Sequence, residues 1–248
     1  MKHITVILLC LFLWPMSIGI AAPTASDVEI AIKKRDIAAL EKMKADGMDV
    51  NMRDSHGNSL VYFTLANTHS AQVLRFLADN GADLNAPIPA SGETPLVYAV
   101  SAADRIQAEA ERVFVGELSP QKREKMADDF KKAAAKELKY AIETVRLLID
   151  LGADINQETP LGTPLMKAAT NAWNSEIVAI LLEAGADVNQ EDQNGRTALF
   201  YAEAYGNSDI SMQLIAAGAD VYHTDVNGKT YIEAEKKDLQ PEEIIHDM

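Results

Sequence analysis

A five-residue segment recurs along this chain of 248 residues and constrains its fold more than any other feature. Its glycines are 34, 71, 33 and 33 residues apart. A repeat period in this range is typical of a solenoid, in which one supersecondary unit stacks on the next. The copies are Gly47-Met-Asp-Val-Asn51, Gly81-Ala-Asp-Leu-Asn85, Gly152-Ala-Asp-Ile-Asn156, Gly185-Ala-Asp-Val-Asn189 and Gly218-Ala-Asp-Val-Tyr222.

Each copy follows a run of residues that favours a helix, such as Ile177 to Leu182. Glycine can take the left-handed backbone conformation that ends a helix, and the small Ala and the Asx residues can shape the turn that follows. The segment is therefore predicted to be the end of one helix and the turn after it.

A second element recurs between these turns and predicts the start of a helix. Thr or Ser caps the free amide groups there, and Pro at the first helical position costs nothing because its missing N–H would be unpaired anyway. Its copies are Gly92-Glu-Thr94-Pro-Leu96, Gly162-Thr163-Pro-Leu165, Gly195-Arg-Thr197-Ala-Leu199 and Gly228-Lys-Thr230-Tyr-Ile232, with a weaker Gly57-Asn-Ser59-Leu-Val61.

Together the two elements resemble the ankyrin repeat, over about residues 25–248. The resemblance implies an all-α fold, a solenoid of about six helix pairs with β-hairpin-like fingers. It also implies that the concave surface, made by the finger tips and the first helix of each pair, binds a partner protein.

The repeat boundaries follow from the two elements. A signal segment at 1–21 precedes an array at 22–248, in which the terminal units act as caps because they lack a neighbour on one side. The units are 22–53 (N-cap), 54–87, 88–157, 158–190, 191–223 and 224–248 (C-cap).

The unit at 88–157 is longer than the others, because Thr94 and Thr163 are 69 residues apart. The excess lies at about 104–139 and is apolar at helical spacing, with a new helix start at Pro120. The simplest structure lengthens both helices of the pair into one long inserted helical hairpin, each arm gaining about 27 Å. This hairpin either only stabilises itself or serves as an additional binding arm.

Residues 1–21 are typical of a secretory signal peptide: a basic start at Lys2, an apolar run from Ile4 to Trp14, and Ala21 before the cleavage site. A retained membrane anchor is the alternative, for which the apolar run is short. Cleavage near Ala21 predicts a periplasmic protein, with secretion as the alternative. It also removes Cys10, the only cysteine, so the mature chain would have no disulfide.

The charge balance bears on the partner. The formal net charge is -14, and losing Lys2 with the signal segment makes it more negative by one. This argues against nucleic acid or an anionic membrane surface as a partner and makes a basic protein the more natural counterpart. We expect no membrane association after cleavage and a monomeric protein.

No pattern in the sequence promises catalysis. The 5 histidines are scattered without metal-ligand spacing, and there is no glycine-rich phosphate loop or Gly-x-Ser-x-Gly turn. Carboxylates such as Asp187 lie in the repeat turns, where capping of the backbone explains them. We therefore expect no catalytic residues, no metal and no cofactor, in a protein that is not an enzyme.

Residues at the turns between paired helices are the first candidates for partner contact. Trp173 and Tyr205 lie there outside the regular packing positions, and aromatic residues are enriched at binding hot spots. Asn171 and His69 belong to the same row of turns.

The fingers and first helices supply the other candidates. His56 lies at a finger tip and Arg196 beside a predicted helix cap. The ankyrin repeat usually carries His after Thr-Pro-Leu, and this chain departs from that pattern in every unit. The residues found there are Tyr62, Val97, Met166 and Phe200. They either pack between repeats or form a hydrophobic contact strip.

The sequence thus predicts an exported bacterial ankyrin-repeat protein that binds another protein without catalysis. Its client is either a toxin, which gives an immunity role, or a resident envelope enzyme, which gives a helper role. The alternatives are an envelope hydrolase, with carboxylates or His on the concave face, and a purely structural scaffold.

Overall fold

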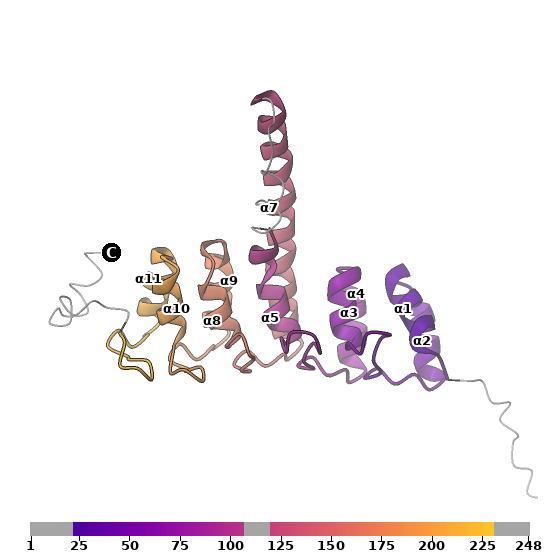
Figure 1. The fold of residues 1–248 in the computed structure, drawn as a ribbon. Helices are drawn as coiled ribbons and strands as arrows, with labels where there is room; N and C mark the ends of the chain where they lie inside the picture. The colour runs from indigo at the N-terminus through magenta and orange to yellow at the C-terminus, as the bar shows by residue number, and fades with distance from the viewer. Residues whose placement is uncertain (1–21, 107–119, 231–248) are drawn as a thin grey trace, which may run out of the picture.

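The computed structural model describes residues 22–106 and 120–230, which form a row of helix pairs (Figure 1). The signal segment predicted at 1–21, part of the first inserted arm at 107–119 and most of the C-terminal cap at 231–248 lie outside the described residues. The helices are α1 (Ala25–Lys34), α2 (Ile37–Ala45), α3 (Leu60–Asn67), α4 (Ala71–Asp79), α5 (Pro95–Val100), α7 (Pro120–Asp150), α8 (Pro164–Ala169), the 3₁₀ turn η1 (Ala172–Asn174), α9 (Ser175–Glu183), α10 (Ala198–Ala204) and α11 (Ser208–Ala216).

Among the predicted caps whose helices the structure describes, all but Thr197 form the expected bond. The Thr94 hydroxyl accepts a hydrogen bond from the N–H of Val97 at 3.3 Å, and Ser59 and Thr163 cap α3 and α8 in the same way. Thr197 occupies the cap position of α10, but its buried hydroxyl makes no such bond. The predicted side-chain cap at Thr197 is therefore wrong.

Helix ends agree with the predicted glycine turn. Gly185 has a φ of 91°, and its N–H donates to the Leu182 carbonyl at 3.0 Å. The N–H of Ala186 donates to the Leu181 carbonyl at 2.9 Å. These two bonds are the Schellman arrangement, which satisfies carbonyls at a helix end.

A hydrogen bond between repeats, which the sequence did not predict, joins successive turns. The Asn156 side chain accepts a bond from the N–H of Asp187 in the next turn, at 2.9 Å. The Asp187 carboxylate in turn accepts from the N–H of Asn189 at 3.0 Å. Asn51, Asn85 and Asn189 each bond to the following turn as Asn156 does. We call this row of bonds the asparagine ladder.

The finger loops are tight turns and not strands. The described residues contain no strand, only isolated antiparallel bridges between Arg53 and Ser59 and between Thr159 and Gly162. In one finger the N–H of Asp192 donates to the Arg196 carbonyl at 2.9 Å. A loop that closes within five residues leaves no length for a ladder of strand pairs.

The core is a continuous stack along the array. Leu96, Leu165 and Leu199, the leucines of the helix-start element, are at most 1% exposed, and they belong to one cluster that runs from the first pair to the last described one. First helices pack on first helices, α5 on α8 and α8 on α10. Five helix pairs lie within the described residues, and the predicted sixth lies beyond them.

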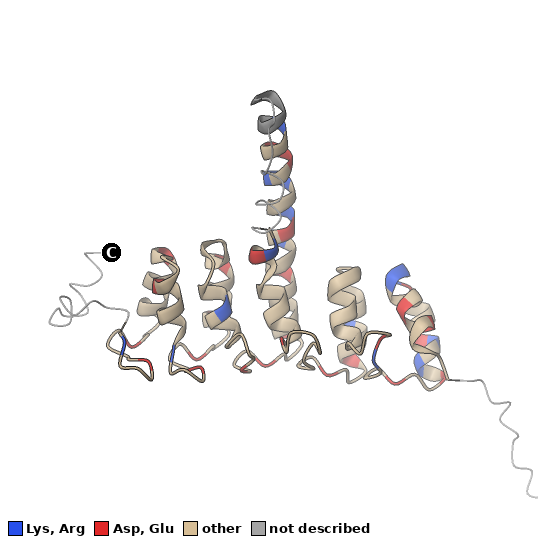
Figure 2. Cartoon of the chain, in the orientation of Figure 1, with Lys and Arg blue, Asp and Glu red and all other residues tan. Residues whose placement is uncertain are grey.

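The inserted arm is described mainly by α7, whose 31 residues begin at Pro120 as predicted. At 1.5 Å per residue the helix is about 46 Å long, and it extends well past the ends of the other helices (Figure 1). Its projecting part carries charges of both signs (Figure 2).

The first helix of this pair is not simply lengthened, as the sequence suggested. α5 ends at Val100, and helix resumes at 102–106 after a turn at Ser101. The single O–H of Ser101 lies within hydrogen-bond distance of two acceptors, the Val97 carbonyl at 2.9 Å and the Glu93 carboxylate at 3.3 Å. A serine that bonds back to a carbonyl four residues earlier tends to bend a helix.

Candidate binding surface

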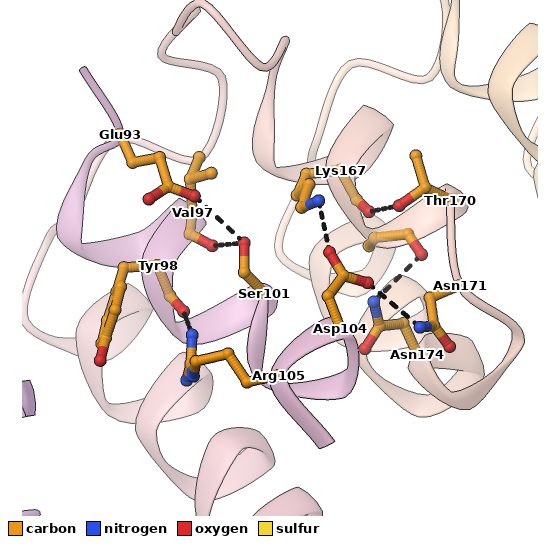
Figure 3. Close-up of polar contacts among 11 residues, drawn as sticks. Glu93, Val97, Tyr98, Ser101, Asp104, Arg105, Lys167, Thr170, Asn171 and Asn174 are labelled. Atoms are coloured by element: carbon orange, nitrogen blue, oxygen red, sulfur yellow. Dashed lines mark hydrogen bonds and ion pairs between the residues drawn. The ribbon is translucent and has the colours of Figure 1, made fainter. Parts of the chain in front are cut away.

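The inserted arm meets the next repeat at a polar junction built on Asp104 (Figure 3). The Asp104 carboxylate forms an ion pair with Lys167 Nζ in α8 and accepts a hydrogen bond from the Asn171 amide at 3.1 Å. The Lys167 side chain is 18% exposed and that of Asp104 37%, so water screens the pair only in part. The junction ties the start of the arm to the repeat after it.

Asn171 links this junction to Trp173. Its side-chain oxygen accepts a hydrogen bond from the Trp173 N–H at 3.0 Å. Asn171 is 8% exposed, whereas Trp173 is 47% exposed on η1. Asn171 therefore has little surface of its own to offer a partner and serves to position the tryptophan.

Trp173 faces an apolar groove along α7. The groove has a volume of about 360 Å³, which lies in the range of ligand sites. Phe130, Ala134 and Leu138 are four residues apart and therefore share one face of the helix. The full lining is Phe130, Lys131, Ala134, Ala135, Leu138 and Trp173.

A cluster of aromatic residues lies where α7 meets α3 and α5. The rings of Tyr62 and Tyr98 meet edge to face, with centroids 4.9 Å apart. The His69 and Tyr140 rings stack at 3.9 Å. Arg105 lies 4.3 Å from the centre of the Tyr98 ring and donates to the Tyr98 carbonyl at 2.8 Å, on the side of the arm away from Asp104 (Figure 3). The rings come from three helices and one turn, and so depend on the arm being in place.

This cluster encloses a cavity of about 40 Å³. Burial raises the pKa of Tyr140, and it also raises that of Tyr62, with Tyr98 contributing. The Tyr140 hydroxyl is buried, without a hydrogen bond of ordinary geometry to any described residue, although the Thr144 hydroxyl is close enough to oppose the rise in pKa. The cavity is lined by Leu65, His69, Tyr98, Ala99, Arg105, Glu137, Tyr140, Ala141 and Thr144.

A second polar cluster lies at the finger of the unit at 191–223. The Tyr201 hydroxyl donates to the Asp192 carboxylate at 2.6 Å. Burial and this carboxylate raise the pKa of Tyr201 to about 12. Burial alone would raise the pKa of Asp192, but the hydrogen bonds from Tyr201 and from two backbone N–H groups hold it below its usual value. Arg196 lies over the Phe200 ring at 5.1 Å.

The predicted contact residues are spread over several places. Tyr62 and His69 belong to the aromatic cluster. His56 is exposed on its finger, and Tyr205 is 63% exposed at the end of α10. Phe200, like Val97 and Met166, is under 10% exposed, so these members of the row pack between repeats.

Sequence reasoning missed Tyr98, Arg105 and Tyr140. Tyr98 follows directly after the row position occupied by Val97, and Tyr201 follows Phe200 in the same way. Both tyrosines are half-buried. A helix turns by about 100° per residue, which brings this next position nearer the surface. The sequence already shows a tyrosine at the same position of two units, and this could have indicated a shared role.

Two further properties concern only the described residues. None of their His, Cys, Asp and Glu side chains gather in a group of three or more that could hold a metal ion. None of their helices is both long enough and apolar enough to cross a membrane.

Comparison with protein families finds one match. A family model described as ankyrin repeats, in 3 copies, matches residues 132–225. These residues include α7 from Lys132 to its end and all of α8 to α11. This part of the chain is therefore similar to ankyrin repeats, which indicate a protein-interaction module. Comparison with curated proteins finds no match.

Proposed function

We propose that this chain, with ankyrin repeats at 132–225, binds one partner protein on the surface between Trp173 and the projecting part of α7, and that it acts by binding alone. The observation that carries the proposal is the half-exposed Trp173 beside a groove of about 360 Å³. Tryptophan in such a setting is the residue most typical of a binding hot spot.

The arm supports this location of the surface. One face of the projecting part of α7 presents Phe130, Ala134 and Leu138 to the same groove as Trp173. The Asp104 junction and Asn171 hold the arm and the tryptophan relative to each other. A partner seated there contacts the arm and the repeats together.

The first test is affinity capture with the chain from Ala22, using the native envelope fraction. We expect one stoichiometric protein to remain after a salt wash and to be lost with Trp173→Ala. Tyr205→Ala is the matched control, because it removes another exposed aromatic residue from a different turn. Equal capture by both variants would contradict the proposed surface.

Intrinsic fluorescence supplies a direct readout. The chain has 2 tryptophans, and one of them, Trp14, lies in the predicted signal segment. The chain from Ala22 therefore has Trp173 alone. Adding the captured protein should shift its emission to shorter wavelength, because the indole leaves water. An unchanged spectrum on a saturated complex would place the contact elsewhere.

Export is the second part of the proposal. Residues 1–21 have the pattern of a cleaved signal peptide, and we propose a periplasmic protein whose client is a toxin or a resident envelope enzyme. N-terminal sequencing of the native protein should begin at Ala22. The identity of the captured client then separates an immunity role from a helper role.

A further inference from the structure

The cavity inside the aromatic cluster is separate from the Trp173 groove, on the other side of the arm. It lies between α5, α7 and the turn that holds His69. We propose that it receives the cationic end of a lysine or arginine side chain from the partner. This inference rests on the proposed function, because it assumes a partner protein. Binding at the cavity can nevertheless be tested with a small molecule and without the partner.

The size of the cavity fits the end of a side chain. Its volume is about 40 Å³, whereas a cavity that holds a single water needs only about 10–15 Å³. The cavity is therefore too small for a whole metabolite and large enough for an ammonium or guanidinium group. Leu65, Ala99 and Ala141 line it as well, and they suit the apolar stem that precedes such a group.

Two polar groups in the wall can accept hydrogen bonds from a cation. Glu137 is half-buried and forms no ion pair with any described residue. The Tyr140 hydroxyl is buried and lacks a hydrogen bond of ordinary geometry. A buried polar group that is poorly hydrogen-bonded is costly. An ammonium or guanidinium group has several N–H donors, so it can donate to the Glu137 carboxylate and to the Tyr140 oxygen at once.

The positive charge in the wall is already engaged. Arg105 lies over the Tyr98 ring and donates to the Tyr98 carbonyl. Burial raises the pKa of Tyr140 most, the Thr144 hydroxyl lowers it, and the Glu137 carboxylate raises it further. Because Arg105 is engaged by Tyr98, Glu137 is the wall carboxylate that can pair with an entering cation.

The charge of the whole chain points in the same direction. A formal net charge of -14 draws a basic partner by long-range attraction. The inserted segment at 104–139 has nine Lys and Arg against eight Asp and Glu and is nearly neutral, so the negative charge lies mainly on the repeats beside it. A basic side chain entering beside Glu137 would be held by the local carboxylate after the overall field has brought the partner close.

The test is a titration of ¹⁵N-labelled protein from Ala22 with Nα-acetyl-arginine amide, followed by NMR. We expect shifts at the amides of Tyr98, Tyr140 and Thr144, and binding that is about fivefold weaker in Glu137→Gln, as for the loss of one partly exposed charge contact. Tyr140→Phe should weaken binding by a smaller factor. Nα-acetyl-glutamate amide should cause no shifts at these amides.

Glu143→Gln is the matched control. It removes the same charge from an exposed position of α7, where Glu143 lies 3.9 Å from Lys139. If this variant weakens binding as much as Glu137→Gln, the effect is general electrostatics and the site is refuted. Tighter binding of the glutamate compound would also refute it. Binding of the arginine compound without any captured partner would support the site and contradict the proposed function.

Discussion

Asp104 and Lys167 form an ion pair across a repeat boundary, at the point where the inserted arm leaves the array. The arm is thereby fixed to the repeat that follows it, while Arg105, the next residue, is held by Tyr98 of its own repeat. Two neighbouring side chains of opposite charge thus hold the base of the arm from both sides.

A double-mutant cycle on Asp104→Ala and Lys167→Ala should give a coupling free energy of about 1 kcal/mol, because the pair is only partly exposed. Urea unfolding of the four proteins measures it. The matched control is the pair Lys139 and Glu143, whose side chains are 77% and 64% exposed and should couple by less than about 0.5 kcal/mol. Equal coupling free energies in the two cycles would show that the Asp104–Lys167 pair stabilises the fold no more than an exposed surface pair does.

Asn156→Ala removes one bond of the asparagine ladder. We expect a loss of about 1 kcal/mol in the free energy of unfolding, because the N–H of Asp187 loses its partner. Hydrogen exchange at the Asp187 amide should become faster, while the equivalent amide of Asp220, bonded to Asn189, serves as the internal control. Unchanged exchange at Asp187 would show that the bond does not form in solution.

Gly185→Ala and Gly162→Ala separate two costs of replacing glycine. Both residues have positive φ, but a Cβ at Gly185 meets nothing within 4 Å, whereas one at Gly162 lies 2.8 Å from Met166 Sδ. We expect about 1 kcal/mol of destabilisation at Gly185 from backbone strain alone, and a larger loss at Gly162 because Met166 must move. Urea unfolding compares them, and a smaller loss at Gly162 would contradict the packing around Met166.

Tyr201 makes stability depend on pH in alkaline solution. Its folded-state pKa is raised to about 12, above the value of about 10 for an unfolded tyrosine. A raised pKa favours the folded state while the hydroxyl is protonated, so this contribution is complete below about pH 10 and is lost as the pH rises toward the folded-state pKa.

Tyr201→Phe should remove that contribution. Unfolding measured from pH 9 to about pH 11 should show a shallower loss of stability in the variant than in the parent chain. Ultraviolet titration, which detects the formation of tyrosinate, should also lose the ionisation step at the highest pH. Tyr222→Phe, an exposed tyrosine, is the control. Identical pH slopes for Tyr201→Phe and the parent would contradict the bond to Asp192.

The repeat and its turns could be predicted from sequence because they depend on local chemistry. Glycine at a helix end, Thr94 as a cap and Pro120 as a helix start each need only their immediate neighbours. Thr197 shows where such a rule fails, since it has the right residue type and position without forming the bond.

The contacts between units could not be predicted in the same way. The asparagine ladder joins residues about one repeat apart, so the same Asn that looks like a turn former also bonds to the next turn. The stacking of His69 on Tyr140 needs the path of α7, which a long insertion leaves open. The position of Trp173 outside the regular packing could be predicted from sequence. The groove beside it could not, because it depends on the direction in which α7 leaves the array.

The asparagine ladder also has a mechanical consequence. Its bonds run along one edge of the array and join each turn to the next, at 2.8–2.9 Å. That edge resists stretching, and the opposite ends of the helices are also tied across repeat boundaries, because Arg35 donates to the Thr68 carbonyl and Asn207 to the Ala169 carbonyl. A pull along the array is therefore opposed at both ends of its helices, so neighbouring repeats are held at two separate points and not by the apolar core alone.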